Sequence, residues 1–341
     1  MFPKRPKRPG NSDTPETART QSGALATIAP PRLWILSDGR AGHEAQTLAI
    51  AAALGAEPRL IYLRPRWPFK ALAPFFPPDP RDLKALTPPL PEMALAAGRR
   101  TLPALRWLKQ RGVFTVYANK PATGARAADV IVAPAHDGFF ARNAVTPPTP
   151  ANLVSRETLR ARLDAPDPRI AVLPAPRVAM LIGGDSKHFR FTPVDSEALA
   201  KIARDLCASG YGVMATLSRR SPPHLLEALS LALDGTNAFL WDGSGPNPYL
   251  DMLAYADHII VTADSVNMLG EAAATGAPAH VFAPSGGSRK MTACLKTLER
   301  LGAVRPWNGR LESWRYEPVN STPMIAAAIM RAWRIFKGLP A

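Results

Sequence analysis

Short apolar runs alternate with amphipathic stretches along most of the chain. The run at 32–37 is followed by an alanine-rich segment at 43–55, in which Ala45, Leu48 and Ala49 recur at helical spacing. The other apolar runs of this half predict strands at 59–63, 93–97, 113–118 and 129–134, with a helix near 101–111. Strands that alternate with helices in this way predict a parallel sheet with crossover helices.

The same alternation restarts after proline-rich segments at 145–152 and 164–177. The second half has predicted strands at 177–184, 211–218, 237–242, 258–264 and 278–283, and predicted helices at 194–209, 223–233, 248–256, 266–276 and 290–302. We therefore expect a second domain of the same α/β kind, with the boundary near residue 170.

The fold class predicted by this pattern is α/β, with two doubly wound Rossmann-like domains facing across a cleft. Residues 31–170 form the first domain, 171–320 the second, and 321–341 a C-terminal amphipathic helix. Thr322 is expected to be the N-cap of that helix, with Pro323 at its first position. In such folds ligands bind outside the carboxyl ends of the strands.

Composition narrows the class of protein. The longest apolar runs are well short of the roughly 18 residues that a membrane span needs. Residues 1–30 are basic, then rich in Pro, Ser and Thr, and lack the apolar core of a secretory signal, so we expect a disordered tail. The 2 cysteines form no CxxC pair and predict no metal site. We expect a cytoplasmic protein, and peripheral attachment to the inner membrane is compatible with these features.

The net charge of +15 predicts an anionic partner. Nucleic acid, nucleoside diphosphates and acidic lipid headgroups all qualify. The basic residues are scattered and form no nucleic-acid-binding motif, so nucleic acid is the least favoured of the three.

Two loops of the second half follow predicted strands and suit phosphate. In "LIGGDSKHF", Gly183 and Gly184 allow close backbone approach, and the residues after them can present amides or positive charge to an anion. The latter residues are Asp185, Ser186 and Lys187. In "TLSRRSPP", Arg219 and Arg220 suit a diphosphate because guanidinium groups match phosphate oxygens. A tight turn and a solvated arginine pair explain the same residues equally simply.

Polar residues also cluster where the strand at 258–264 meets its helix. Asp264, Ser265 and Asn267 can contact a ligand, although Asp264 or Ser265 can equally be a helix cap. Glu271 can accept both hydroxyl groups of a ribose, or be an exposed helical glutamate. Asn247, in the loop at 243–248, can contact a nucleobase or cap the next helix.

Acid–base candidates come from the first half. "SDGRAGHEAQ" places Asp38 and His43 after the first strand, and "APAHDGFFARN" places His136 and Asp137 after a later one. His43 is the preferred general base, with Asp38 and Asp137 as alternatives. Each loop is also explained by a simple turn.

The segment "RPRWPFKALAPFFPPDPR" (64–81) mixes basic and aromatic residues. It interleaves the basic residues Arg64, Arg66 and Lys70 with the aromatic residues Trp67, Phe69, Phe75 and Phe76. This mixture suits an anionic membrane interface. A core edge with a solvated loop explains it as well.

Taken together, several motifs resemble the elongated-mitochondria fission-protein family. They are "LWILSDGRAGHEAQTLAIAAALG", "LIGGDSKHF", "SRR" and "NPYLDMLAYADHIIVTADSVNMLGEAAATGAPAHVF". The resemblance runs from about residue 32 to about residue 300. It implies, for the plant members, recruitment of a dynamin-type fission machine to the mitochondrial surface.

A more distant resemblance is to the GT-B glycosyltransferases, especially the enzyme that adds N-acetylglucosamine to lipid I. It implies that Gly42 and His43 match the Gly-Gly-His loop of the first domain, although "RAGH" replaces the contiguous motif. It also implies that Gly183–Ser186 match the glycine-rich loop of the second domain and that Glu271 matches the ribose-binding glutamate. The implied site binds a nucleoside-diphosphate sugar and needs neither metal nor cofactor.

Two functions of different classes follow. One is a metal-independent glycosyltransferase with a nucleoside-diphosphate sugar donor and a lipid-linked or envelope-related acceptor. The other is a catalytically inactive peripheral-membrane adaptor of the fission-family type.

Overall fold

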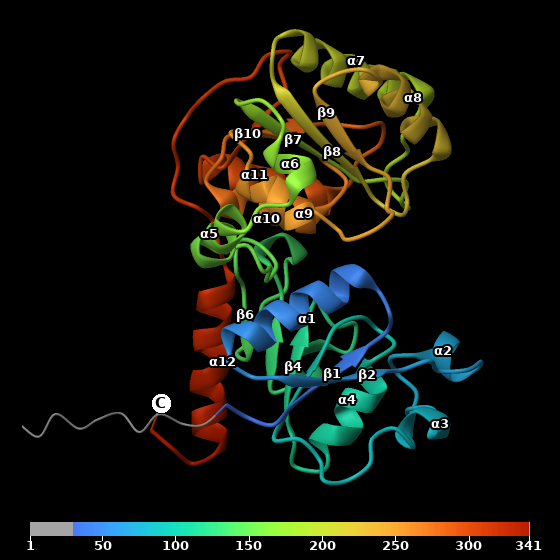
Figure 1. The fold of residues 1–341 in the computed structure, drawn as a ribbon. Coiled ribbons are helices and arrows are strands. Elements are labelled where there is room, and N and C mark those ends of the chain that lie inside the picture. Colours follow the sequence, from blue (N-terminus) through green and yellow to red (C-terminus); the bar gives the residue numbers. More distant parts are fainter. Residues whose placement is uncertain (1–29, 341) are drawn as a thin grey trace, which may run out of the picture. The chain divides into compact units, whose positions relative to one another are not determined.

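The computed structural model describes residues 30–340, and the disordered tail predicted for 1–30 lies outside these residues apart from Pro30 (Figure 1). The described part contains two six-stranded parallel sheets, each flanked by helices. The predicted fold class, α/β with two doubly wound Rossmann-like domains and a C-terminal helix, is therefore confirmed. No helix among residues 30–340 is long and apolar enough to cross a membrane.

The first sheet has the strand order β2-β1-β3-β4-β5-β6. Its strands are β1 (Leu33–Ser37), β2 (Pro58–Tyr62), β3 (Met93–Ala96), β4 (Phe114–Ala118), β5 (Val130–Val132) and β6 (Ala144–Val145). Strands β1, β3, β4 and β5 are buried along their whole length, which explains their continuous apolar runs. The chain runs from β1 outward to β2 and then returns to β3 on the other side, so the topological switch point lies between β1 and β3.

The second sheet has the strand order β12-β11-β10-β7-β8-β9. Its strands are β7 (Arg177–Ile182), β8 (Gly212–Leu217), β9 (Ala238–Trp241), β10 (His258–Thr262), β11 (Ala279–Phe282) and β12 (Val304–Pro306). Here the strand order reverses between β7 and β10, which are paired in parallel. Each sheet thus has one switch point, at the first strand of its domain.

The helices expected from the sequence pattern are all present. They are α1 (Ala41–Ala53), α4 (Leu102–Lys109), α7 (Pro193–Ala208), α8 (Pro223–Leu233), α9 (Tyr249–Ala254), α10 (Val266–Thr275), α11 (Arg289–Arg300) and α12 (Thr322–Phe336). Other short elements were not predicted: α2 (Phe69–Leu72), α3 (Pro80–Leu83), α5 (Arg156–Asp164), α6 (Pro168–Ala171), η1 (Gly124–Ala127), η2 (Ala135–Asp137), β6 and β12. Helix α5 has no buried residue and hence no apolar stripe to detect.

The chain begins to pack against the second sheet before the boundary that was expected near residue 170. Helix α5 packs against α9, and Val154, Ile170 and Leu173 lie in one hydrophobic core with residues of β7 and β10. The segment from about residue 154 onward therefore packs against the second sheet, because its few apolar side chains are buried there.

Helix α12 returns to the first sheet, where it packs against α1, β4 and β5 (Figure 1). The Phe336 and Phe114 rings lie 5.2 Å apart. The predicted N-cap was wrong: Ser321 is the N-cap residue and Thr322 begins the helix. The Thr322 hydroxyl instead donates to the backbone carbonyl of Asn152 at 2.8 Å. The hydroxyl that was expected to cap the helix is thus used in a buried hydrogen bond between segments that are distant in sequence.

Two buried histidines lie side by side near the amino ends of β10 and β11. The rings of His258 and His280 are 6.0 Å apart, and His280 also packs edge-on against Trp307 and Trp314. Burial, together with the neighbouring His258, lowers the pKa of His280 to about 4. Burial also lowers the pKa of His258. Both rings are therefore neutral in the folded protein at pH 7.

This pair predicts that the protein loses stability in mild acid. A histidine with a lowered folded pKa costs no stability above its unfolded pKa of about 6.5 and destabilises as pH falls from there toward the folded value. For His280 we expect a loss of roughly 1 to 2 kcal/mol between pH 7 and pH 5, allowing for solvent screening. Urea unfolding at both pH values should give a smaller pH difference for His280→Asn. The exposed His188→Asn is the matched control, and an unchanged pH difference in His280→Asn would contradict this assignment.

Candidate functional site

Asp38 and His43 form a hydrogen-bonded pair at the switch point of the first sheet. Asp38 follows β1 and His43 lies in the first turn of α1. The His43 Nδ1 atom is 2.9 Å from Asp38 Oδ1, and the Asp38 side chain is only 3% exposed. Because a carboxylate accepts hydrogen bonds, Nδ1 donates and Nε2 is left as the basic nitrogen. The arrangement is that of a general base oriented by a carboxylate.

Gly98 and Tyr117 complete this site, and sequence reasoning missed both. Gly98 follows β3 with φ at +89°, and a Cβ atom there would lie 2.6 Å from both Asp38 Oδ2 and His43 Nδ1. Burial and the negative charge of Asp38 raise the pKa of Tyr117, so its phenol stays neutral. A glycine directly after the apolar run at 93–97 was the available signal.

The switch point of the second sheet is organised around the buried carboxylate of Asp264. It accepts hydrogen bonds from the Gly184 amide at 2.9 Å and the Thr262 hydroxyl at 2.7 Å. The Gly183 amide in turn donates to the Thr262 hydroxyl at 2.8 Å. A Cβ on Gly183 would collide with both carboxylate oxygens of Asp264, so this glycine is required for the close packing of the two strand ends.

The glycine loop uses its amides within the protein. Besides the two glycine amides, the Asp185 amide donates to Arg220 O and the Ser186 amide donates to Phe189 O, each at 3.0 Å. The Asp185 carboxylate accepts from the Phe191 amide at 2.8 Å. These groups therefore stabilise the loop itself, whereas the side chain of Lys187 is exposed.

The two arginines after β8 differ in their surroundings. Arg220 donates to the carbonyls of Gly184 and Asp185 at 3.1 and 2.8 Å and lies 3.3 Å from Asp264. It connects the ends of β7, β8 and β10. Arg219 is exposed and makes no hydrogen bond or ion pair to the other residues of 30–340. Arg219 is therefore the arginine that is free to meet a ligand.

The starts of α10 and α1 meet between the two switch points. Ser265 is the N-cap of α10 and accepts from the Met268 amide, whereas Asp264 does not cap. The side-chain oxygen of Asn267 accepts from Gln46 Nε2 at 2.9 Å, and a Cβ on Gly42 would lie 2.7 Å from Asn267. Because helix N-termini carry partial positive charge, an anion between these helices is favoured.

Glu271 is not the exposed helical glutamate of the alternative interpretation. Its carboxylate accepts a hydrogen bond from the Tyr249 hydroxyl at 2.6 Å, between α10 and α9. Burial raises the pKa of Glu271 to about 7, while the bond from Tyr249 opposes that rise. Asn247 lies nearby in sequence, in an exposed loop, where its side chain accepts from the Tyr249 amide at 3.0 Å, and the helix cap is Pro248.

Asp137 lies apart from the Asp38–His43 pair. It ends η2 after β5, three strands away from β1 and hence about 14 Å along the sheet. Its carboxylate pairs with Lys290 of α11 at 2.6 Å. No group of three or more His, Cys, Asp or Glu residues is placed to hold a metal ion within the described residues 30–340.

The contact between Gly183 and Asp264 generates a stability prediction. Gly183→Ala should destabilise the protein by about 3 kcal/mol or more, because the new Cβ must displace a buried carboxylate. Gly270→Ala is the matched control. Its Cβ would meet the side chain of Thr149 at 3.2 Å and Pro150 at 3.6 Å, and alanine favours the helix, so we expect a change within about 1 kcal/mol. Chemical denaturation measures both, and equal stability of the two variants would contradict the proposed close packing.

A family model described as Mitochondrial fission ELM1 matches residues 41–333. The chain is 29% identical over 271 residues to the mitochondrial fission protein ELM1 of Arabidopsis thaliana, covering 71% of this chain and 64% of the plant protein. It is 26% identical to an uncharacterized protein of Rickettsia prowazekii (strain Madrid E), covering 89% of this chain and 99% of that one. The match thus spans slightly less than two thirds of the plant relative.

Solved structures share the fold at low sequence identity. A putative UDP-N-acetylglucosamine 2-epimerase from Listeria monocytogenes is 12% identical, with a TM-score of 0.53 and coverage of 92% and 99% of the two chains. S. aureus MnaA, solved with UDP, is 12% identical with a TM-score of 0.50 and covers 91% of each chain. Acinetobacter baumannii MurG is 14% identical with a TM-score of 0.48, over 91% and 96%. The first two likenesses establish the fold alone.

Proposed function

The chain belongs to the mitochondrial fission ELM1 family, and from this premise and the geometry of its two switch points we propose that it is a metal-independent glycosyltransferase that uses a nucleoside-diphosphate sugar. One observation carries the proposal. An oriented base, His43, and a partly buried carboxylate, Glu271, belong to two helices whose first two turns lie beside each other, because Gln46 of one helix donates a hydrogen bond to Asn267 of the other.

The donor would bind to the second domain. Glu271 would accept hydrogen bonds from the ribose hydroxyls, and the start of α10 with Arg219 and Lys187 would stabilise the diphosphate. The loop at 243–248, with Asn247, would contact the base. The UDP found in the S. aureus relative of this fold makes UDP-sugars the first donors to test.

The acceptor would bind to the first domain. A cavity of about 340 Å³ lies beside Asp38 and is also lined by Gly39, Glu44, Tyr62, Leu63 and Arg64. His43 Nε2 would take the proton of the acceptor hydroxyl while the oxygen of that hydroxyl forms a bond to the anomeric carbon of the donor sugar. The bond from that carbon to the diphosphate breaks, and the negative charge on the leaving diphosphate is stabilised by helix N-termini and fixed cations.

Glu271 provides the test of this function. Glu271→Gln should weaken binding of a UDP-sugar by about tenfold or more, because hydrogen bonds to a charged acceptor contribute about 1.5–3 kcal/mol. Since the pKa of Glu271 is raised to about 7, affinity in the unmodified protein should increase from pH 6 to pH 8 as the carboxylate ionises, and Glu271→Gln should lose this dependence. Isothermal titration calorimetry measures both quantities.

The exposed Glu227→Gln on α8 is the control for this experiment. It removes one carboxylate without touching the site and should bind the nucleotide as the unmodified protein does. Equal affinity of Glu271→Gln and Glu227→Gln for every nucleoside-diphosphate sugar tested would overturn the proposed site.

A second candidate function, an adaptor at a membrane surface, rests on residues 64–84, here called the aromatic loop. Trp67, Phe75 and Phe76 are 82%, 71% and 43% exposed. Phe69 is half-buried and packs edge-on against Phe76 at 6.2 Å between ring centroids. Large exposed aromatic side chains gathered in one loop suit an apolar or interfacial partner.

The aromatic loop is held in shape by buried carboxylates. Asp79 accepts from the Arg66 amide and guanidinium at 2.7–2.9 Å, and from the Arg81 amide at 2.9 Å. These bonds hold the pKa of Asp79 well below its usual range. Asp82 accepts from the Arg64 amide at 3.0 Å. The acidic groups thus face inward, and the aromatic rings stay outside.

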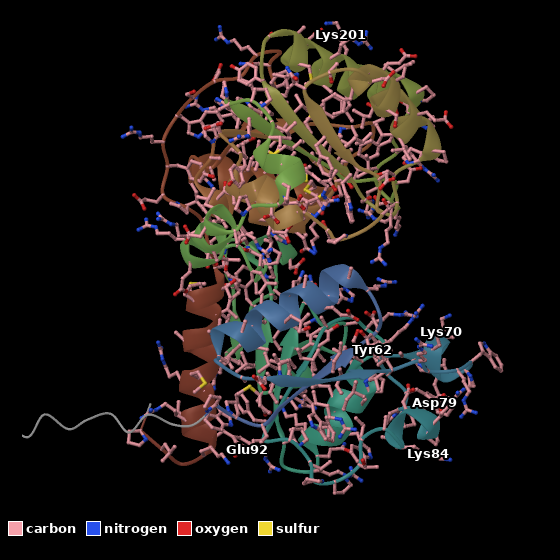
Figure 2. All side chains as sticks on the ribbon, in the orientation of Figure 1. Tyr62, Lys70, Asp79, Lys84, Glu92 and Lys201 are labelled. Carbon is pink, nitrogen blue, oxygen red and sulfur yellow. The ribbon has the colours of Figure 1, made fainter. Side chains whose placement is uncertain are left out.

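The charge on the outside of the aromatic loop is positive. Its exposed basic residues are Arg64, Arg66, Lys70, Arg81 and Lys84. Figure 2 shows Lys70 and Lys84 projecting from this loop, with Asp79 between them. Positive charge around exposed aromatic rings favours anionic lipid headgroups. A glycosyltransferase with a lipid-linked acceptor would use the same surface.

This surface predicts binding to anionic vesicles. Trp67→Ala with Phe75→Ala should weaken co-sedimentation with phosphatidylglycerol-containing vesicles by about tenfold or more, because two large apolar side chains no longer insert. The control is Phe140→Ala with Leu231→Ala, which removes two side chains of 84% and 81% exposure elsewhere. Equal sedimentation of the two double variants would assign the aromatic loop a purely structural role.

A further inference from the structure

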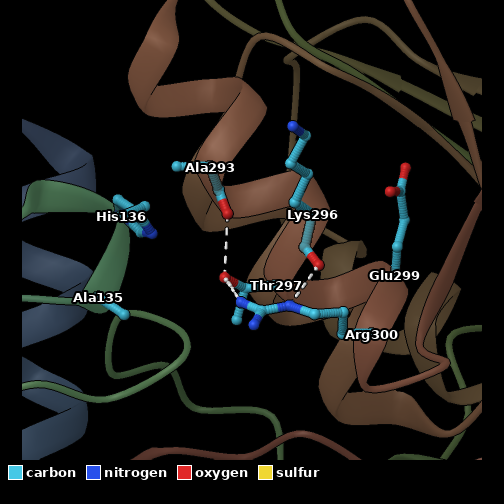
Figure 3. Close-up of a pocket in the computed structure, with 7 residues that line it drawn as sticks. All are labelled: Ala135, His136, Ala293, Lys296, Thr297, Glu299 and Arg300. Carbon is cyan, nitrogen blue, oxygen red and sulfur yellow. Dashed lines mark hydrogen bonds between the residues drawn. The ribbon is translucent and has the colours of Figure 1, made fainter.

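A cavity of about 790 Å³ lies between η2 and α11, away from the Asp38–His43 pair (Figure 3). Its lining residues are Ala135 and His136 of η2 and Ala293, Lys296, Thr297, Glu299 and Arg300 of α11. The volume lies within the range of about 300–1,000 Å³ that is typical of small-molecule sites. Neither of the functions proposed above uses it.

Buried polar atoms without hydrogen-bond partners gather beside this cavity. Both ring nitrogens of His136 and Oδ2 of Asp137 are buried and make no hydrogen bond within the described residues. Buried polar groups are normally paired with a hydrogen-bond partner. Such a concentration is explained by a polar ligand that supplies the missing partners.

The charge that faces this cavity is positive. Lys296 and Arg300 are one helical turn apart, and neither forms a salt bridge with another residue of 30–340. Arg300 is held against its own helix by bonds to the Lys296 carbonyl at 3.2 Å and the Thr297 hydroxyl at 3.3 Å. Figure 3 shows Arg300 extending toward η2, whereas the Glu299 carboxylate points away from it.

The neighbouring carboxylate does not oppose an anion in this cavity. Asp137 is neutralised by Lys290 at 2.6 Å. Burial lowers the pKa of His136 to about 4, so the ring is neutral at pH 7 and offers one N–H donor and one acceptor nitrogen. These residues fit a ligand that carries an anionic group, which the two cations would bind, and a hydroxyl group or acidic proton, which His136 would bind.

We propose that the cavity between η2 and α11 is a binding site for a small molecule that carries a phosphate or diphosphate group, held by Lys296, Arg300 and His136. The anionic group contacts Lys296 and Arg300, while the Thr297 hydroxyl donates to the Ala293 carbonyl at 2.9 Å and accepts from Arg300. His136 hydrogen-bonds the same group or a hydroxyl beside it. Because η2 belongs to the first sheet and α11 to the second, an occupant of this site contacts both domains.

Side-chain NMR of the full chain tests this proposal with inorganic pyrophosphate as the probe. The imidazole ¹H–¹⁵N resonances of His136, assigned with His136→Gln, should shift saturably as pyrophosphate is added at constant ionic strength. Lys296→Ala with Arg300→Ala should weaken this response by about tenfold or more, equivalent to about 1.4 kcal/mol. Both replaced side chains are exposed, so the variant should fold, and circular dichroism confirms that.

The control is Arg156→Ala with Arg160→Ala, which removes two exposed positive charges at the same helical spacing from α5. It should respond to pyrophosphate as the unmodified protein does. A His136 resonance that does not move, or an equal loss in both double variants, would overturn the proposal. The readout involves neither Glu271 nor a sugar nucleotide, so it is independent of the proposed transferase function.

Discussion

The organisation of the second domain depends on one buried carboxylate, that of Asp264. A charge with no exposed surface is tolerated only where hydrogen bonds and a cation satisfy it, and here the Gly184 amide, the Thr262 hydroxyl and Arg220 do so. Satisfying it draws the ends of β7, β8 and β10 together and forces glycine at 183. It also leaves Ser265 to cap α10, and thereby sets where that helix begins and where Asn267 meets Gln46.

This constraint explains which parts of the site could be predicted from the sequence. Strand and helix positions follow from apolar periodicity, because every central strand is buried on both faces and every long helix has one apolar side. The assignment of the glycine loop to the end of β7 follows in the same way. The hydrogen-bond partners of the loop's amides do not follow from the sequence. The sequence would be the same whether these amides donated to a ligand or to Asp264.

The burial of Glu271 and the path of α12 were beyond sequence reasoning for a related reason. Glu271 is partly buried and accepts a hydrogen bond from Tyr249, on another helix, and α12 leaves the second domain where the hydroxyls of Ser321 and Thr322 bind residues 149–152. Such long-range pairings have no local periodicity. Gly98 is the exception, since a glycine directly after a buried strand is visible in the sequence.

The two candidate functions place different demands on the first domain. An adaptor needs the exposed rings of the aromatic loop and the buried Asp79 and Asp82 that hold it. It does not need a nearly inaccessible Asp38 that orients His43 beneath a glycine with positive φ. The Asp38–His43–Gly98 arrangement is thus used by the proposed transferase, which needs an oriented base, and has no use in the proposed adaptor.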